Sequence, residues 1–109
     1  MQSQDLNWKG VNMPKAYWVT TYRSITNPEG VAAYAKIAGP AIKEAGGRFI
    51  VRGMPAHTFE HGLKERTVVI EFDSLENALA AHETPAYREA IKALGNSCER
   101  DMRVVEGVE

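Results

Sequence analysis

Four short stretches of the chain are dense in β-branched and aromatic residues, and this pattern favours β-strands. The predicted strands span residues 16–23, 48–53, 66–72 and 101–105. Within the second, alternation places Arg48, Ile50 and Arg52 on one face and Phe49 and Val51 on the other. We expect the more apolar set of each strand to face the helices.

Two longer stretches carry apolar residues at steps of three and four, the spacing of a helix with one buried face. The first begins at Pro28 behind an Asn27 N-cap and ends at Gly46–Gly47, where glycine accepts the left-handed backbone of a helix end. Pro40 lies inside it, and a kink is expected there. The second starts after Asp73 or Ser74 and restarts at Thr84–Pro85 before ending near Gly95.

The order β-α-β-β-α-β predicts an α+β, ferredoxin-like split βαβ fold, an antiparallel sheet with both helices on one face. The other face then has no cover in the chain. It carries side chains too apolar to stay in water over a whole face, namely Tyr17, Val19, Ile50 and Val69. A partner sheet is the natural cover, so we expect a homodimer, as in a dimeric α+β barrel.

Length and composition limit the possibilities further. The 109 residues, 44% hydrophobic and 25% charged, suit one globular domain over residues 14–109, with residues 1–13 as a flexible N-terminal extension. The net charge is −1, and no basic stripe predicts a nucleic-acid partner. No apolar stretch is long enough to cross a membrane. A single cysteine, Cys98, excludes an internal disulfide framework and favours a cytoplasmic protein.

Several segments together resemble the domain-of-unknown-function family 1330. They are Ala16–Val19, the Gly46–Gly53 segment (GGRFIVRG), Val68–Phe72, Pro85–Tyr87 and Glu106–Gly107. The resemblance implies a dimeric α+β barrel, and the family has no agreed activity. Many members of the family carry a sequence similar to Trp-Tyr-x-Ser directly before a Pro-x-Tyr motif, whereas this chain has Ala-His-Glu-Thr at positions 81–84. If the aromatic pair lines a pocket in those members, the wall of the corresponding pocket in this chain is expected to differ.

Polar side chains on the second face of the sheet are the main candidates for a site. Alternation places Arg52 and Glu71 there, with Tyr17 nearby. Arg52 would bind a carboxylate or enolate oxygen through its forked donors, and Glu71 would carry a proton or orient Arg52. The alternative is a structural ion pair at the mouth of the barrel.

Three histidines need separate comment. His57 and His61 lie in an H-x-x-E-H pattern, which binds zinc only on a helix, and the segment is too short and turn-rich for one. No metal site is therefore predicted. If this loop folds over the barrel mouth, Glu60 or His61 would touch a ligand. His82, near the junction of two helical segments, is the remaining catalytic candidate, although packing or capping is its more usual role.

The preferred hypothesis is a small protein that binds or transforms a small molecule at the barrel mouth, without metal or cofactor, and the forked donors of Arg52 would suit an anionic one. Whether it is an enzyme is left open. One alternative is a non-catalytic dimerisation or scaffold module. A more remote one is a haem or metal protein, which would need an axial histidine such as His82.

Overall fold

The computed structural model describes residues 14–108, so the predicted extension over residues 1–13 lies outside the described residues. The elements follow the order β-α-β-β-α-α-β, since the second helical stretch is divided in two. They are β2 (Ala16–Ile25), α1 (Pro28–Glu44), β3 (Arg48–Gly53), β4 (Thr67–Phe72), α2 (Leu75–His82), α3 (Pro85–Leu94) and β5 (Cys98–Glu106).

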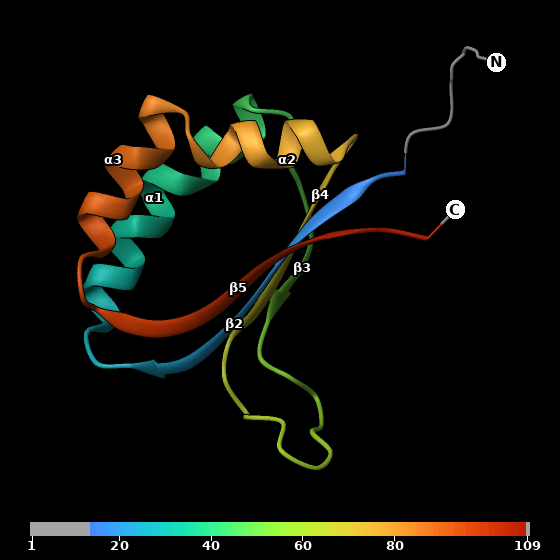
Figure 1. Cartoon of the computed structure of the whole chain (residues 1–109). Coiled ribbons are helices and arrows are strands. Elements are labelled where there is room, and N and C mark those ends of the chain that lie inside the picture. Colours follow the sequence, from blue (N-terminus) through green and yellow to red (C-terminus); the bar gives the residue numbers. More distant parts are fainter. Residues whose placement is uncertain (1–13, 109) are drawn as a thin grey trace, which may run out of the picture.

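The four strands form one antiparallel sheet in the order β3-β4-β2-β5. The helices lie together on one face of this sheet, and no other described element covers the opposite face (Figure 1). This is the predicted α+β, ferredoxin-like arrangement. Within residues 14–108, no helix is both long and apolar enough to cross a membrane.

The helices begin where the sequence places capping side chains. Asn27 Oδ1 accepts a hydrogen bond from Gly30 N at 3.3 Å, and Thr84 Oγ1 accepts one from Tyr87 N at 3.1 Å. Of the two residues proposed to cap α2, Ser74 does so by accepting from Asn77 N. Gly46 follows α1 with φ of 96°, as predicted for a left-handed helix end.

The core lies between the sheet and the helices. The largest fully buried side chains of the core are Trp18, Phe72 and Tyr87. The centre of the Trp18 ring lies 5.2 Å from the centre of the Phe72 ring and 5.1 Å from that of the Tyr87 ring. Trp18 Nε1 donates to Ala78 O at 2.9 Å, so its one polar atom is satisfied. Strand β2 is thereby fixed to α2 and α3.

Strand β3 departs from simple alternation. Phe49 pairs with Ile70 and Val51 pairs with Val69, so Ile50 is an extra residue that forms a β-bulge. Beyond the bulge the two faces are exchanged. Val51 therefore lies on the uncovered face, and Arg52, opposite the buried Val68, lies on the helix face. The prediction that Arg52 faces away from the helices is wrong for this reason.

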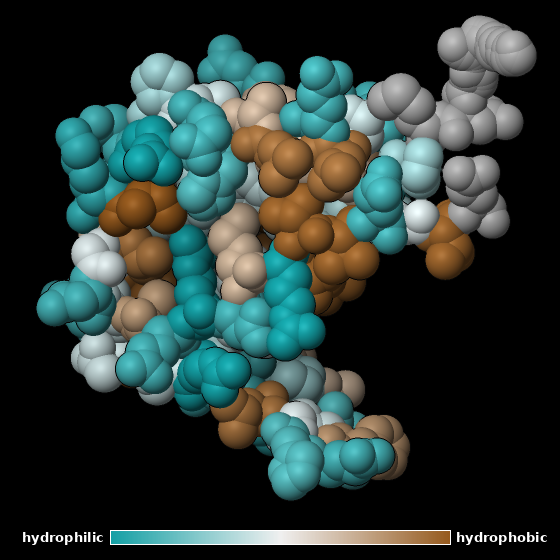
Figure 2. All heavy atoms as spheres, viewed as in Figure 1, coloured by the Kyte–Doolittle hydropathy of each residue, from teal (hydrophilic) through white to brown (hydrophobic). Residues whose placement is uncertain are grey.

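Two exposed features stand out on the surface. The connection between β3 and β4, residues 54–66, projects away from the helices (Figure 1) and carries Phe59, which is 78% exposed. A hydrophobic area lies below α2, where Leu79 approaches Met102 and Val104 of β5 (Figure 2).

Candidate functional site

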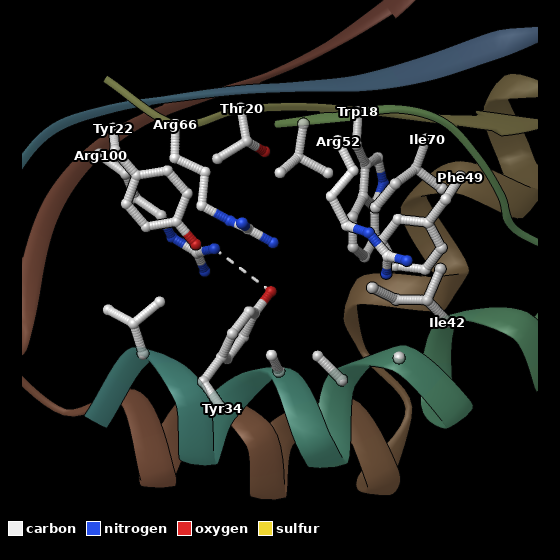
Figure 3. Close-up of a pocket in the computed structure, with 15 residues that line it drawn as sticks. Trp18, Thr20, Tyr22, Tyr34, Ile42, Phe49, Arg52, Arg66, Ile70 and Arg100 are labelled. Atoms are coloured by element: carbon white, nitrogen blue, oxygen red, sulfur yellow. Dashed lines mark hydrogen bonds between the residues drawn. The ribbon is translucent and has the colours of Figure 1, made fainter. Parts of the chain in front are cut away.

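A pocket lies between α1 and the helix-facing side of the sheet (Figure 3). Its cavity volume is about 50 Å³, and it opens to the outside, so a ligand larger than a few water molecules would extend through this opening. Its walls combine apolar and basic side chains. The lining residues are Trp18, Thr20, Tyr22, Val31, Tyr34, Ala35, Ala38, Gly39, Ile42, Phe49, Arg52, Arg66, Val68, Ile70 and Arg100.

Three arginines reach this pocket from three places in the chain. Arg52 follows the bulge of β3, Arg66 directly precedes β4, and Arg100 lies on β5. Figure 3 shows Arg66 and Arg100 at the end near Tyr34, and Arg52 at the other end beside Phe49. The Arg52 guanidinium carbon lies 4.7 Å from the centre of the Phe49 ring. Positive charges that surround one cavity repel one another, and an anion bound between them would offset this repulsion.

These arginines lack acidic partners in the described part of the chain. Every ion pair among residues 14–108 joins other side chains, and no carboxylate lines the pocket. Arg66 and Arg100 are half-buried, whereas Arg52 is exposed. The pocket is therefore a positively charged, partly desolvated site.

Arg100 is held by two tyrosines. Its Nη1 donates to the Tyr34 hydroxyl at 3.2 Å and its Nη2 to the Tyr87 hydroxyl at 3.3 Å. The two hydroxyl oxygens are 2.8 Å apart. Burial, and then the neighbouring Tyr87, raise the pKa of Tyr34 well above its usual 10.0. Tyr34 therefore stays a neutral phenol at physiological pH. Both tyrosine rings are buried.

The predicted pair of Tyr17 and Glu71 forms on the opposite, uncovered face. Tyr17 Oη donates to Glu71 Oε2 at 3.1 Å, and Arg48 Nε donates to Glu71 Oε1 at 3.0 Å. Arg48 Nη2 also donates to Asp73 Oδ1 at 2.9 Å. The hydrogen bond from Arg48 lowers the pKa of Glu71 and of Asp73. Arg52 takes no part, so the structure does not assemble a site of Arg52, Glu71 and Tyr17.

The other candidates lie apart from both groups. Glu60 is exposed in the projecting loop, with φ of 52°. His82 Nδ1 lies 3.0 Å from Glu83 Oε2, and its ring packs 5.2 Å from that of Tyr87 without lining the pocket.

The H-x-x-E-H segment is a loop, as expected, with a turn at Glu60 and His61. His57 and His61 line a shallow hollow beside Thr21 and Asp101 of the uncovered face. Among the described residues, no group of three or more His, Cys, Asp or Glu side chains is placed to hold a metal ion.

Sequence reasoning missed Arg66, Arg100 and the polar role of Tyr34. The last strand was predicted to start at Asp101, but β5 starts at Cys98 and therefore includes Arg100. The spacing of Cys98, Arg100, Met102 and Val104 was the available signal, because the other three are apolar residues packed against the core. No comparable pattern marks Arg66, which lies at the end of a loop.

Several solved structures share this fold. RPA0582, a protein of unknown function from Rhodopseudomonas palustris, superposes with a TM-score of 0.69 at 17% identity, over 90% of this chain and 85% of that one. SnoaB, a cofactor-independent oxygenase from Streptomyces nogalater, gives a TM-score of 0.61 at 11% identity, over 88% and 95% of the two chains. A dimeric protein of unknown function and ferredoxin-like fold from Bacteroides fragilis gives 0.51 at 15% identity, over 85% and 96%.

Identities this low show the shared fold alone. No curated protein matches the chain significantly. The model of the domain of unknown function DUF1330 matches residues 15–108, which is nearly the whole chain. The chain therefore belongs to the DUF1330 family.

Proposed function

We propose that this protein binds, and either carries or transforms, a small organic anion in the pocket between α1 and the sheet. The observation that carries the proposal is the set of three arginines, Arg52, Arg66 and Arg100, around one cavity that no carboxylate lines. Guanidinium groups are the usual partners of carboxylates and other planar oxyanions, because their donors match two oxygens at once.

Energetics favour an anion over a neutral ligand. A half-buried arginine has lost part of its hydration, and neither Arg66 nor Arg100 forms an ion pair among residues 14–108 that would replace it. A bound anion supplies that replacement. Hydrogen bonds to a charged group each contribute about 1.5–3 kcal/mol, so three of them correspond to a Kd between about 1 mM and about 1 μM.

The opposite side of the pocket suits the organic part of such a ligand. Helix α1 contributes apolar side chains, including Val31, Ala38 and Ile42, and Phe49 stands at the far end beside Arg52. Small-molecule sites typically combine apolar walls with a few convergent polar groups. SnoaB, which has this fold, is named a cofactor-independent oxygenase, so the fold is compatible with small-molecule chemistry without a cofactor.

The first test is native mass spectrometry of the purified protein, followed by calorimetric titration with benzoate, acetate and inorganic phosphate. We expect an anion to bind, and Arg66→Gln to weaken its binding about tenfold or more. Arg103→Gln is the matched control, because Arg103 is 71% exposed and forms an ion pair with Asp101 at 2.9 Å.

Two results would contradict the proposal. One is that none of the anions binds and the protein carries no small mass, which would favour a non-catalytic dimerisation module. The other is that Arg66→Gln and Arg103→Gln weaken binding equally, which would mean that a general surface charge, and not this pocket, attracts the anion.

We also propose that the working form is a homodimer, formed through the uncovered face of the sheet. Ile50 and Val51 at the bulge of β3 are 52% and 46% exposed, and Val19 and Val69 lie between them and β5. These apolar side chains lie at the centre of the face, between polar ones such as Glu71 at one end and Asp101 at the other, and an exposed apolar patch of this kind often marks a protein–protein interface. A neighbour of the same fold is described as dimeric, which supports the same arrangement here.

A further inference from the structure

Tyr34 and Tyr87 meet at the wall of the pocket with a defined set of hydrogen-bond partners. Their hydroxyl oxygens are 2.8 Å apart, and Arg100 donates to both. Tyr87 is completely buried and does not line the pocket, whereas Tyr34 does. Figure 3 shows the Tyr34 hydroxyl directed from α1 toward the sheet, into the space between the basic side chains.

Counting donors and acceptors fixes the direction of the bond between the tyrosines. A phenol has one hydrogen to donate, and arginine can only donate. In the described part of the chain, Tyr87 has no acceptor for its hydrogen except the Tyr34 oxygen, and full burial keeps water away. Tyr87 therefore donates to Tyr34, and the Tyr34 oxygen accepts from both Tyr87 and Arg100.

The hydroxyl hydrogen of Tyr34 then has no hydrogen-bond acceptor in the described part of the chain. The hydroxyl's two lone pairs are occupied, and no acceptor for its hydrogen exists among residues 14–108. The hydroxyl lies on the pocket wall, so this hydrogen is available to a ligand. Because burial raises the pKa of Tyr34, the hydroxyl keeps this hydrogen at neutral pH.

We propose that Tyr34, oriented by Tyr87 and Arg100, donates a hydrogen bond to an oxygen of the bound anion, and that this anion is a compact carboxylate with an apolar body. The inference rests on the proposed function and names the ligand class of the same site. A carboxylate offers one oxygen to Tyr34 and the other to a guanidinium, while its body packs against Ile42 and Phe49. Inorganic phosphate would leave those apolar walls unused.

The test is calorimetric titration of the full chain with benzoate, with benzamide as the neutral analogue and inorganic phosphate as the anion without an apolar body. We expect benzoate to bind more tightly than either. Tyr34→Phe removes the donated hydrogen bond together with the two that the Tyr34 oxygen accepts from Tyr87 and Arg100, and it should weaken benzoate binding about tenfold or more. Tyr87→Phe should weaken it less, because Tyr34 keeps its hydrogen. Tyr17→Phe, on the uncovered face, should leave it unchanged.

The outcomes separate this inference from the proposed function. If benzoate binds in a manner that depends on Arg66, but Tyr34→Phe binds it as tightly as the wild type, the assignment of Tyr34 is wrong and anion binding stands. If phosphate binds and benzoate does not, the carboxylate class is wrong. If no anion binds, both proposals are wrong.

A second measurement covers the case in which Tyr34→Phe does not fold. In wild-type protein labelled with carbon-13 at the tyrosine Cζ, benzoate should shift the Tyr34 signal more than that of Tyr17. When the hydroxyl donates a hydrogen bond, the electron density at the attached Cζ changes, and its chemical shift changes with it. Equal or absent shifts at saturating benzoate would overturn the assignment.

Discussion

Glu71 links two strands through one carboxylate. It accepts hydrogen bonds from Arg48 of β3 and Tyr17 of β2, at 3.0 and 3.1 Å. Sequence reasoning expected Arg52 as its partner, because alternation places Arg48 and Arg52 on one face. The bulge at Ile50 leaves only Arg48 in place. A single extra residue therefore separates the structural ion pair from the proposed ligand site.

The lowered pKa of Glu71 predicts a pH-dependent stability. Because the hydrogen bond from Arg48 holds this pKa below its usual 4.5, folding is stabilised above that value and the contribution disappears as pH falls through the folded pKa. Glu71→Gln should therefore lower the urea midpoint at about pH 7 and have little effect at about pH 2.

Glu99→Gln is the control, because Glu99 is exposed on β5 and forms no ion pair within residues 14–108. Glu99→Gln should leave the difference in urea midpoint between the two pH values as it is in the wild type. An equal effect of Glu71→Gln at both pH values would show that the contribution is not electrostatic.

At the scale of elements, the junction of α1 and β3 depends on a close approach. A Cβ at Gly47 would lie 2.6 Å from Ile42 Cγ2 and 3.0 Å from both Ile70 Cγ2 and Phe72 Cε1. The absence of a side chain therefore lets the end of α1 pack onto β4. This contact also sets where α1, and with it Tyr34, stands over the sheet.

Gly47→Ala should destabilise the protein by about 1–3 kcal/mol, because it forces three buried side chains to move. Urea denaturation measures the loss. Gly53→Ala, at the far end of the strand that Gly47 precedes, is the matched control, since nothing lies within 4 Å of its added Cβ. If the two variants are equally stable, the packing at Gly47 is looser than the structure indicates.

At the scale of the whole molecule, one face of the sheet is covered by helices and the other is open (Figure 1). The proposed dimer predicts that a charge on the open face disrupts association. Val51→Lys should convert the dimer into a monomer, because burying an unpaired ammonium group between two sheets costs several kcal/mol. Light scattering over a range of concentrations measures the mass.

Leu79→Lys is the matched control, because Leu79 is similarly exposed, at 51%, on α2 and outside the open face. It should remain dimeric. If Leu79→Lys dissociates while Val51→Lys does not, the copies associate through the hydrophobic area between α2 and β5 (Figure 2). If the wild type is a monomer throughout, the dimer proposal is wrong.

The sequence by itself determined the elements and their order. Asn27, Thr84 and Gly46 mark helix ends because capping and left-handed backbone depend on local residue type. Alternation in β2 and β4 placed Trp18 and Phe72 in the core, since a regular strand has a fixed period of two. The order of elements then determined the antiparallel sheet with helices on one face.

Only the tertiary structure decided the composition of the candidate site. The bulge in β3 depends on pairing with β4, so nothing local indicated that Arg52 would turn to the helix side. Tyr34, Tyr87 and Arg100 come from two helices and an edge strand, and their hydrogen bonds exist only after these elements pack together. Contacts between residues distant in the chain depend on register and packing, which a residue pattern does not encode locally.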